Sequence, residues 1–162
     1  MGLFDFLKKK DNADVIAAPV AGEAVESSQI NDPTFGEEML GKGIAIKPTD
    51  TKVYAPFDGT VALVFDTKHA ISLVSETGAE VLIHVGLDTV SLKGEHFTTH
   101  VENGAAVKKG DLLMEFDKEA IAVAGFETII PVVVCNSDDY KGVKRITGSV
   151  VKPGDTIMEL EK

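Results

Sequence analysis

Two stretches of this chain repeat each other, and this repetition limits the fold more than any other sequence feature. Residues 104–115 read GAAVKKGDLLME and residues 148–159 read GSVVKPGDTIME, with no gap between the two patterns. A shorter motif, Ala-Pro-x-x-Gly, occurs at residues 18–22 and again at 55–59. Each unit has the pattern of a strand, a glycine turn and a second strand. We expect such repeated units to pair as the halves of one compact body.

The remainder of the sequence favours strands over helices. From Val15 onward, short runs of β-branched and apolar residues alternate with Gly, Pro, Asn and Asp. Residues 32–40 and 117–124 are the brief exceptions, and each could hold one helical turn. The pattern predicts an all-β fold, an antiparallel β-sandwich or barrel-like body with internal repeats and only short helical turns. The length of 162 residues suits one domain, which we expect to span residues 15–162.

Residues 1–14 differ from the rest and are expected to form a flexible amphipathic tail and linker. In this segment Leu3, Phe4 and Leu7 share one helical face, and three lysines follow at residues 8–10. A short apolar face beside a basic cluster can rest on an anionic membrane surface. The alternative is a frayed terminus, because so short a helix is marginal in water.

Composition excludes several classes of function. The net charge of −10 argues against a nucleic-acid surface, which requires a basic patch, but it permits a basic protein partner. No stretch approaches the ~18 apolar residues of a membrane span. The N-terminal residues do not have the pattern of a secretory signal. The single cysteine, Cys135, suits a reducing cytoplasm and is expected to be a small buried residue.

Two histidines, His69 and His84, lie on the arms of one predicted β-hairpin whose turn is residues 75–79. If the turn centres on residues 76–77, the two histidines are directly opposed, with Cβ atoms about 4.5–5.5 Å apart. A bulge at Gly78 would shift this match by one residue. The pair could be two ordinary strand histidines, or a site for proton, metal or phosphoryl chemistry.

Strand alternation adds candidate partners to this pair. It places Phe65, Thr67, His69 and Ile71 on one face, and Asp88 lies a few residues beyond His84. The threonine hydroxyl can bind one ring nitrogen and so fix a tautomer. A neutral imidazole with one nitrogen held and the other free is a nucleophile, and a neighbouring imidazole can donate to an oxyanion.

A set of longer segments surrounds the histidines. These segments are GKGIAIKP at 41–48, APFDGTV at 55–61, TKHA at 67–70, VLIHVGLDTV at 81–90 and LKGE at 92–95. Together they resemble the glucose-family enzyme IIA domain of the bacterial phosphoenolpyruvate–sugar phosphotransferase system. The resemblance covers nearly the whole chain from about Ile16, and HVGLDTV at 84–90 is its most specific part. One departure is His96, since family members commonly carry glycine before the phenylalanine at position 97.

The resemblance implies a cytoplasmic phosphocarrier, a phosphotransferase component peripheral to the inner face of the cell membrane through residues 1–10. His84 would accept a phosphoryl group from the carrier protein HPr and pass it to a cysteine of the enzyme IIB domain of a sugar permease. His69 would stabilise the phosphoryl oxygens, Thr67 would orient a ring, and Asp88 would support the site. The resemblance also implies an apolar collar on which partners dock, formed by Phe35, Met39, Leu40, Phe65 and Val90.

The resemblance implies that the protein requires no cofactor. Family members also bind regulatory target proteins, in some cases through a zinc ion shared by the two histidines, here His69 and His84. One alternative function is a zinc-dependent hydrolase of a related barrel, given the His-x-x-x-Asp spacing of His84 and Asp88, although no third histidine ligand is placed. Another is a lipoyl or biotinyl carrier modified at Lys118, which would leave the histidine pair unexplained.

Overall fold

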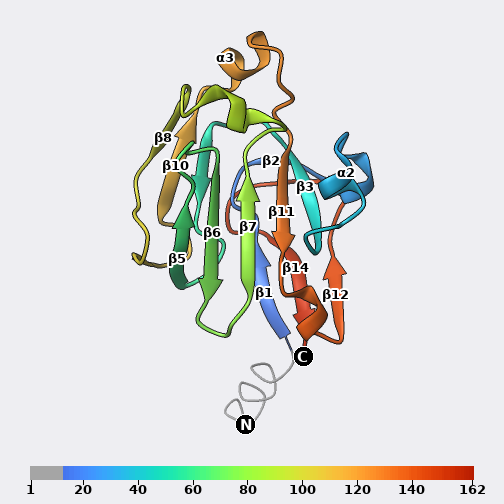
Figure 1. Ribbon diagram of the computed structural model, residues 1–162. Coiled ribbons are helices and arrows are strands. Elements are labelled where there is room, and N and C mark those ends of the chain that lie inside the picture. The colour runs from blue at the N-terminus through green and yellow to red at the C-terminus, as the bar shows by residue number, and fades with distance from the viewer. Residues whose placement is uncertain (1–12) are drawn as a thin grey trace.

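The computed structural model describes residues 13–162 and confirms the expected all-β fold (Figure 1). The strands are β1 (Ala13–Ala17), β2 (Gly22–Glu26), β3 (Lys42–Pro48), β4 (Lys52–Tyr54), β5 (Gly59–Val64), β6 (Ala70–Ser75), β7 (Glu80–His84), β8 (Phe97–Thr99), β9 (Ala106–Val107), β10 (Leu112–Phe116), β11 (Ile130–Val134), β12 (Gly142–Arg145), β13 (Ser149–Val151) and β14 (Thr156–Glu161). Thus β1 begins two residues before the expected domain boundary, whereas the tail prediction for residues 1–12 lies outside the described residues.

Helical structure within residues 13–162 is limited to short pieces. These are α2 (Pro33–Gly36), α3 (Lys118–Val123) and the 3₁₀ turns η1 (Ser27–Gln29), η2 (Thr89–Leu92) and η3 (Ser137–Asp139). Both α-helices fall within the segments where the sequence predicts a helical turn, and an aspartate side chain caps each first turn. None of the helices in this part of the chain has the length and apolar composition needed to cross a membrane.

The strands form three antiparallel sheets. The largest has the order β13-β2-β3-β11-β7-β6-β5-β9, and the smaller two have the orders β1-β14-β12 and β4-β10-β8. In Figure 1, β6, β7 and β11 lie side by side at the front, with β1 and β14 behind them. The large sheet therefore presents one face to the small sheets and one face outward.

Each face of the large sheet packs against its own apolar cluster. Along β7, Val81 and Ile83 belong to the larger cluster, which also holds Ile16 of β1 and Ile157 of β14. Leu82, which lies between them in sequence, belongs to the second cluster. This alternation follows from the two-residue period of a strand. The second cluster lies on the outward face, where it is positioned to surround a functional site.

The two sequence repeats contact each other crosswise. Ala18 exchanges two backbone hydrogen bonds of 2.7 and 3.1 Å with the turn at residues 154–155. Ala55 makes the equivalent bonds of 2.8 and 2.9 Å with the turn at residues 110–111. In both turns the aspartate side chain accepts a hydrogen bond from the backbone N–H three residues earlier. The repeats are therefore alike in structure as well as in sequence, because each Ala-Pro motif is hydrogen-bonded to a distant Gly-Asp turn.

Gly43 of β3 is a point of close backbone contact in the large sheet. A Cβ atom at this position would lie 2.1 Å from the carbonyl oxygen of Val132 in β11. At Gly142 of β12, by contrast, the nearest atom to a Cβ would be a carboxylate oxygen of Glu161 at 3.8 Å. The first glycine is required by packing, and the second is not.

Gly43→Ala should lower the free energy of unfolding by about 1–3 kcal/mol, since the β11 backbone has to move to admit the methyl group. Gly142→Ala is the matched control and should change it by no more than about 0.5 kcal/mol. Urea titrations followed by circular dichroism measure both values. Equal effects of the two substitutions would contradict the steric argument.

Candidate functional site

His69 and His84 lie side by side, but the register predicted from a turn centred on residues 76–77 is wrong. Strands β6 and β7 pair Ala70, not His69, with His84. The turn is the cause, because Gly78 has a φ of +101° and extends the hairpin loop to residues 76–78. The shift of one residue is the one expected from a bulge at this glycine.

The predicted strand face is also only partly correct. Ile71 packs into the larger cluster, whereas Phe65, which contacts His69, packs against the second cluster. His69 precedes β6 and follows Lys68, whose φ of +60° takes the backbone out of the strand alternation. The histidine ring can therefore reach the outward face although its strand neighbour at position 71 points inward.

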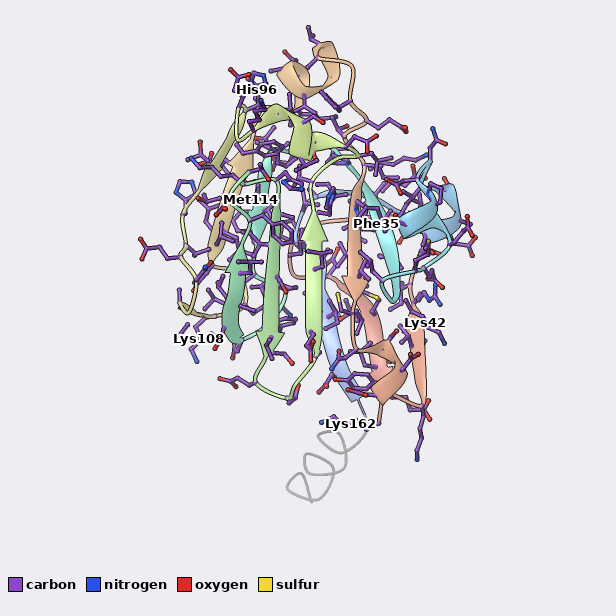
Figure 2. All side chains as sticks on the ribbon, in the orientation of Figure 1. Phe35, Lys42, His96, Lys108, Met114 and Lys162 are labelled. Atoms are coloured by element: carbon purple, nitrogen blue, oxygen red, sulfur yellow. The ribbon has the colours of Figure 1, made fainter. Side chains whose placement is uncertain are left out.

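The two imidazole rings are close and mutually perpendicular. Their centroids are 4.7 Å apart with an interplanar angle of 85°. Phe35 lies 4.8 Å from the His84 ring and Phe65 lies 5.6 Å from the His69 ring. Phe35 reaches from α2 over the large sheet, as Figure 2 shows. His69 is only 3% exposed and His84 is half-buried, so the more accessible ring of the pair is that of His84.

A backbone carbonyl fixes the tautomer of His84. The Nδ1 atom lies 2.7 Å from the carbonyl oxygen of Gly86. Because a carbonyl oxygen can only accept, Nδ1 carries the hydrogen and donates it. In the neutral ring the lone pair is then on Nε2, the nitrogen that nucleophilic chemistry requires.

The Gly86 carbonyl is itself held in place. Gly86 has a φ of +80°, and a Cβ there would lie 2.6 Å from Thr89 Cγ2 and 2.8 Å from the carbonyl oxygen of Glu127. The buried Thr89 hydroxyl donates to the Val85 carbonyl at 2.6 Å. Only glycine combines this backbone angle with such close neighbours, so the loop after β7 is built around it.

The expected hydrogen bond between Thr67 and His69 is present. Thr67 Oγ1 lies 2.7 Å from His69 Nδ1. If the hydroxyl donates, the hydrogen of the neutral His69 ring is on Nε2. Both rings are then held at Nδ1, by a hydroxyl in one case and by a carbonyl in the other.

Burial keeps both histidines neutral. It lowers the pKa of His69 from 6.5 to about 4, and the neighbouring His84 adds to this shift. Burial also lowers the pKa of His84 below 6.5, against the opposing effects of the Gly86 hydrogen bond and of the carboxylates of Asp32 and Asp88. At neutral pH, therefore, both rings are uncharged and the lone pair of His84 is available.

The two carboxylates near His84 come from different loops. Asp88 is exposed and has a φ of +60° in the loop after β7. Asp32 caps α2, accepting a hydrogen bond of 2.9 Å from the Thr34 backbone. Asp32 was not among the predicted site residues. Its Asp-Pro-Thr sequence signals a helix cap, but only the tertiary fold brings it near His84.

The structure brings some of the predicted collar to the histidines. Phe35 and Phe65 contact the rings, as described above, whereas Met39, Leu40 and Val90 are 69%, 45% and 51% exposed. A docking role for the three exposed residues stays a prediction.

The expectation for Cys135 was wrong, since this residue follows the last residue of β11 and is exposed. His96 has a φ of +76°, a left-handed backbone angle that favours glycine.

The alternative sites have little support in the geometry. Across residues 13–162, no group of three or more His, Cys, Asp and Glu side chains is arranged to hold a metal ion. The histidine pair alone would supply two of the four ligands that zinc prefers. Lys118, the candidate carrier lysine, is the first residue of α3 and does not lie in a turn between two strands.

Comparisons with known proteins agree on one family. The sequence profile described as phosphoenolpyruvate-dependent sugar phosphotransferase system, EIIA 1, matches residues 14–140. The chain is 42% identical over 153 residues to the PTS system glucose-specific EIIA component of Oceanobacillus iheyensis, which covers 94% of this chain and 93% of that protein. The solved glucose permease IIA from Mycoplasma capricolum superposes with a TM-score of 0.82 at 31% identity, covering 91% of this chain and 95% of that one.

A second kind of relative is much longer. The chain is 49% identical over 147 residues to the PTS system beta-glucoside-specific EIIBCA component of Dickeya chrysanthemi. The match covers 91% of this chain but only 23% of that relative. Neither the relatives nor the solved structure support a hydrolase or a lipoyl carrier.

Lowering the pH should destabilise the wild-type protein more than the His69→Gln variant. The pKa of His69 is 6.5 when unfolded and about 4 when folded, so between these values the unfolded state binds the extra proton. The contribution of neutral His69 to the free energy of unfolding is therefore complete above pH 6.5 and is lost as the pH falls toward 4. Glutamine does not titrate, so that contribution disappears in the variant.

Urea titrations at about pH 7 and about pH 5 measure the difference for each protein. Gly142→Ala, which removes no titratable group, is the control and should retain the wild-type pH dependence. Parallel losses of stability in wild type and His69→Gln would show that His69 is not the buried neutral group described above.

Proposed function

Because this chain belongs to the EIIA 1 family of the phosphoenolpyruvate-dependent sugar phosphotransferase system, we propose that its histidine pair carries the phosphoryl group in sugar uptake. The phosphocarrier role follows from the family, and the assignment to His84 is ours. The single observation that supports it most is the hydrogen bond from His84 Nδ1 to the Gly86 carbonyl, which leaves Nε2 with its lone pair.

In the proposed acceptance step, His84 Nε2 attacks the phosphorus of the phosphohistidine on HPr. A new N–P bond forms at Nε2 while the donor's N–P bond breaks, and the donor imidazole leaves with that electron pair. As the new bond forms, the His84 ring gains positive charge. The Gly86 carbonyl oxygen, already bound to Nδ1–H, stabilises that charge without reorganisation.

His69 is proposed to stabilise the phosphoryl oxygens without accepting the group. With the Thr67 hydroxyl donating to Nδ1, the Nε2–H of His69 is a donor, as an oxyanion requires. The perpendicular ring arrangement, with centroids 4.7 Å apart, is compatible with this role. The aromatic walls of Phe35 and Phe65 exclude water, which strengthens the electrostatic interaction and limits hydrolysis of the adduct.

The proposed partners are HPr as donor and an enzyme IIB domain as acceptor. The name of the EIIBCA relative joins an A part with a B part in one chain, which favours onward transfer to a IIB cysteine. The exposed Met39, Leu40 and Val90 supply an apolar docking surface, and the carboxylates of Asp32 and Asp88 give its centre negative charge. Such a surface suits a partner with an apolar patch and basic residues around it.

The transfer as proposed uses no cofactor. A zinc ion shared by His69 and His84 would need its remaining ligands from a bound regulatory protein, since the described residues supply no third ligand. We therefore keep zinc as a feature of a regulatory complex and assign it no part in the transfer.

His84→Gln should abolish labelling by phosphoenolpyruvate in the presence of the general enzyme and HPr. His69→Gln should still be labelled, but transfer to a IIB domain should fall by about 10²-fold, because the oxyanion loses a preorganised donor. Mapping of the adduct, which should be acid-labile and base-stable, checks the site. Labelling of the His84→Gln variant under the same conditions would contradict the assignment.

We also propose that residues 1–10 hold the protein at the cytoplasmic face of the membrane, on the basis of their apolar residues and lysines. Deleting these residues should reduce binding to anionic vesicles and leave acceptance from HPr in solution unchanged. Vesicle co-sedimentation of full-length and truncated protein measures the first effect, and the labelling assay measures the second. Equal vesicle binding of the two proteins would remove the membrane proposal.

A further inference from the structure

We propose that the Glu38–Arg145 ion pair is a positioning device that fixes Phe35 against His84 and thereby shapes the docking surface. This inference rests on the proposed function for its consequences in phosphoryl transfer, although its structural part can be tested without it. Neither residue belongs to the predicted site, and neither contacts the rings. Their effect would act through the segment that carries Phe35.

The Glu38 carboxylate joins three elements of the fold. It accepts hydrogen bonds from the Ser27 hydroxyl at 3.0 Å and from the Gly43 backbone N–H at 3.2 Å. The Arg145 guanidinium donates to both of its oxygens and also to the Gly43 carbonyl at 3.3 Å. The carboxylate thus connects η1, β3 and β12 at one point.

The backbone of Glu38 connects this point directly to Phe35. Its N–H donates to the Phe35 carbonyl at 3.1 Å, and its carbonyl accepts from Gly41 at 3.2 Å. Glu38 has a φ of +57°, a left-handed conformation that is strained for a non-glycine residue. The hydrogen bonds of its side chain offset this strain. Loss of the ion pair would therefore release the turn that follows α2.

That turn belongs to a segment with several functional residues. Residues 27–41 carry Phe35, whose ring lies 4.8 Å from the His84 ring, and Asp32, whose carboxylate acts on the His84 pKa. They also carry Met39 and Leu40, which are 69% and 45% exposed. The segment contains one 3₁₀ turn and one short α-helical turn, so its position depends on contacts with the rest of the fold as well as on its own hydrogen bonds.

The pair lies at the surface of the molecule. A polar hollow of about 470 Å³ lies beside it, lined by residues that include Ser27, Ser28, Glu38 and Arg145. The two side chains keep 26% and 30% of their surface exposed. Because water reaches both charges, removing one of them does not leave an isolated buried charge, and the fold should survive.

The structural test is NMR of the His84 ring protons in the unphosphorylated protein. In wild type these resonances should carry a ring-current shift from Phe35, whose ring lies 4.8 Å from that of His84. Phe35→Ala removes that shift and gives the reference value for its absence. Glu38→Gln and Arg145→Met should move the His84 resonances measurably toward this reference, and Arg145→Lys should restore part of the wild-type shift. The control is Glu115→Gln, which breaks the similarly exposed His100–Glu115 pair in another sheet and should leave the resonances unchanged.

The functional test separates docking from chemistry. With phospho-HPr as donor, Glu38→Gln should raise KM about five- to tenfold while kcat changes less than about twofold, because the docking surface moves but the His84 tautomer does not. His84 resonances and KM that stay at wild-type values in Glu38→Gln and Arg145→Met would overturn the proposal, even if both variants melt at lower temperature. If wild type itself accepts no phosphate, the proposed function fails, and the NMR result still decides whether the pair positions Phe35.

Discussion

The proposed chemistry of this protein depends on a hydrogen bond between His84 and a backbone carbonyl two residues later. A side-chain acceptor could rotate or titrate, whereas the Gly86 carbonyl can do neither. The contacts of the loop with Thr89 and with the Glu127 backbone fix its direction. Burial and the tautomer both make Nε2 of His84 available. The lowered pKa keeps the ring neutral, and the hydrogen bond at Nδ1 leaves the lone pair on Nε2. The remainder of the site can be described as support for that one free lone pair.

Much of this site could be predicted from local sequence, for identifiable reasons. The strand patterns gave the fold class, because alternation and glycine turns are local signals. The pairing of His69 with His84 followed from one hairpin, although its register was wrong by one residue because the conformation of Gly78 decides the loop length. The exposed Cys135 was also missed, since burial at the end of a strand depends on what covers that end. The first error arises where a single backbone angle overrides periodicity, and the second where a position at the end of a strand overrides the usual burial of a residue type.

Contacts between distant segments were beyond sequence reasoning. Asp32 and Glu38 lie in a segment whose sequence predicts one helical turn, but nothing in the spacing links either of them to His84 or Arg145. The Glu38–Arg145 pair spans 107 positions of the chain. Residues of this kind act on the site through the position of a loop, so their chemistry is visible only once the fold is known. The segment around α2 thus brings aromatic packing, negative charge and exposed apolar side chains together, from residues with no common motif.

The pairing of β1 with β14 has a consequence for biosynthesis. The first described strand is completed by the last, and Asp14 near the start accepts a hydrogen bond from Tyr140. Ala18 likewise has its two backbone hydrogen bonds with the turn at residues 154–155, which is synthesised much later. A chain still attached to the ribosome cannot close these contacts, so its final topology forms only after release or after a following segment has emerged. Such long-range closure is slow relative to local pairing, and it leaves the nascent strands dependent on protection from aggregation until the C-terminal strand arrives.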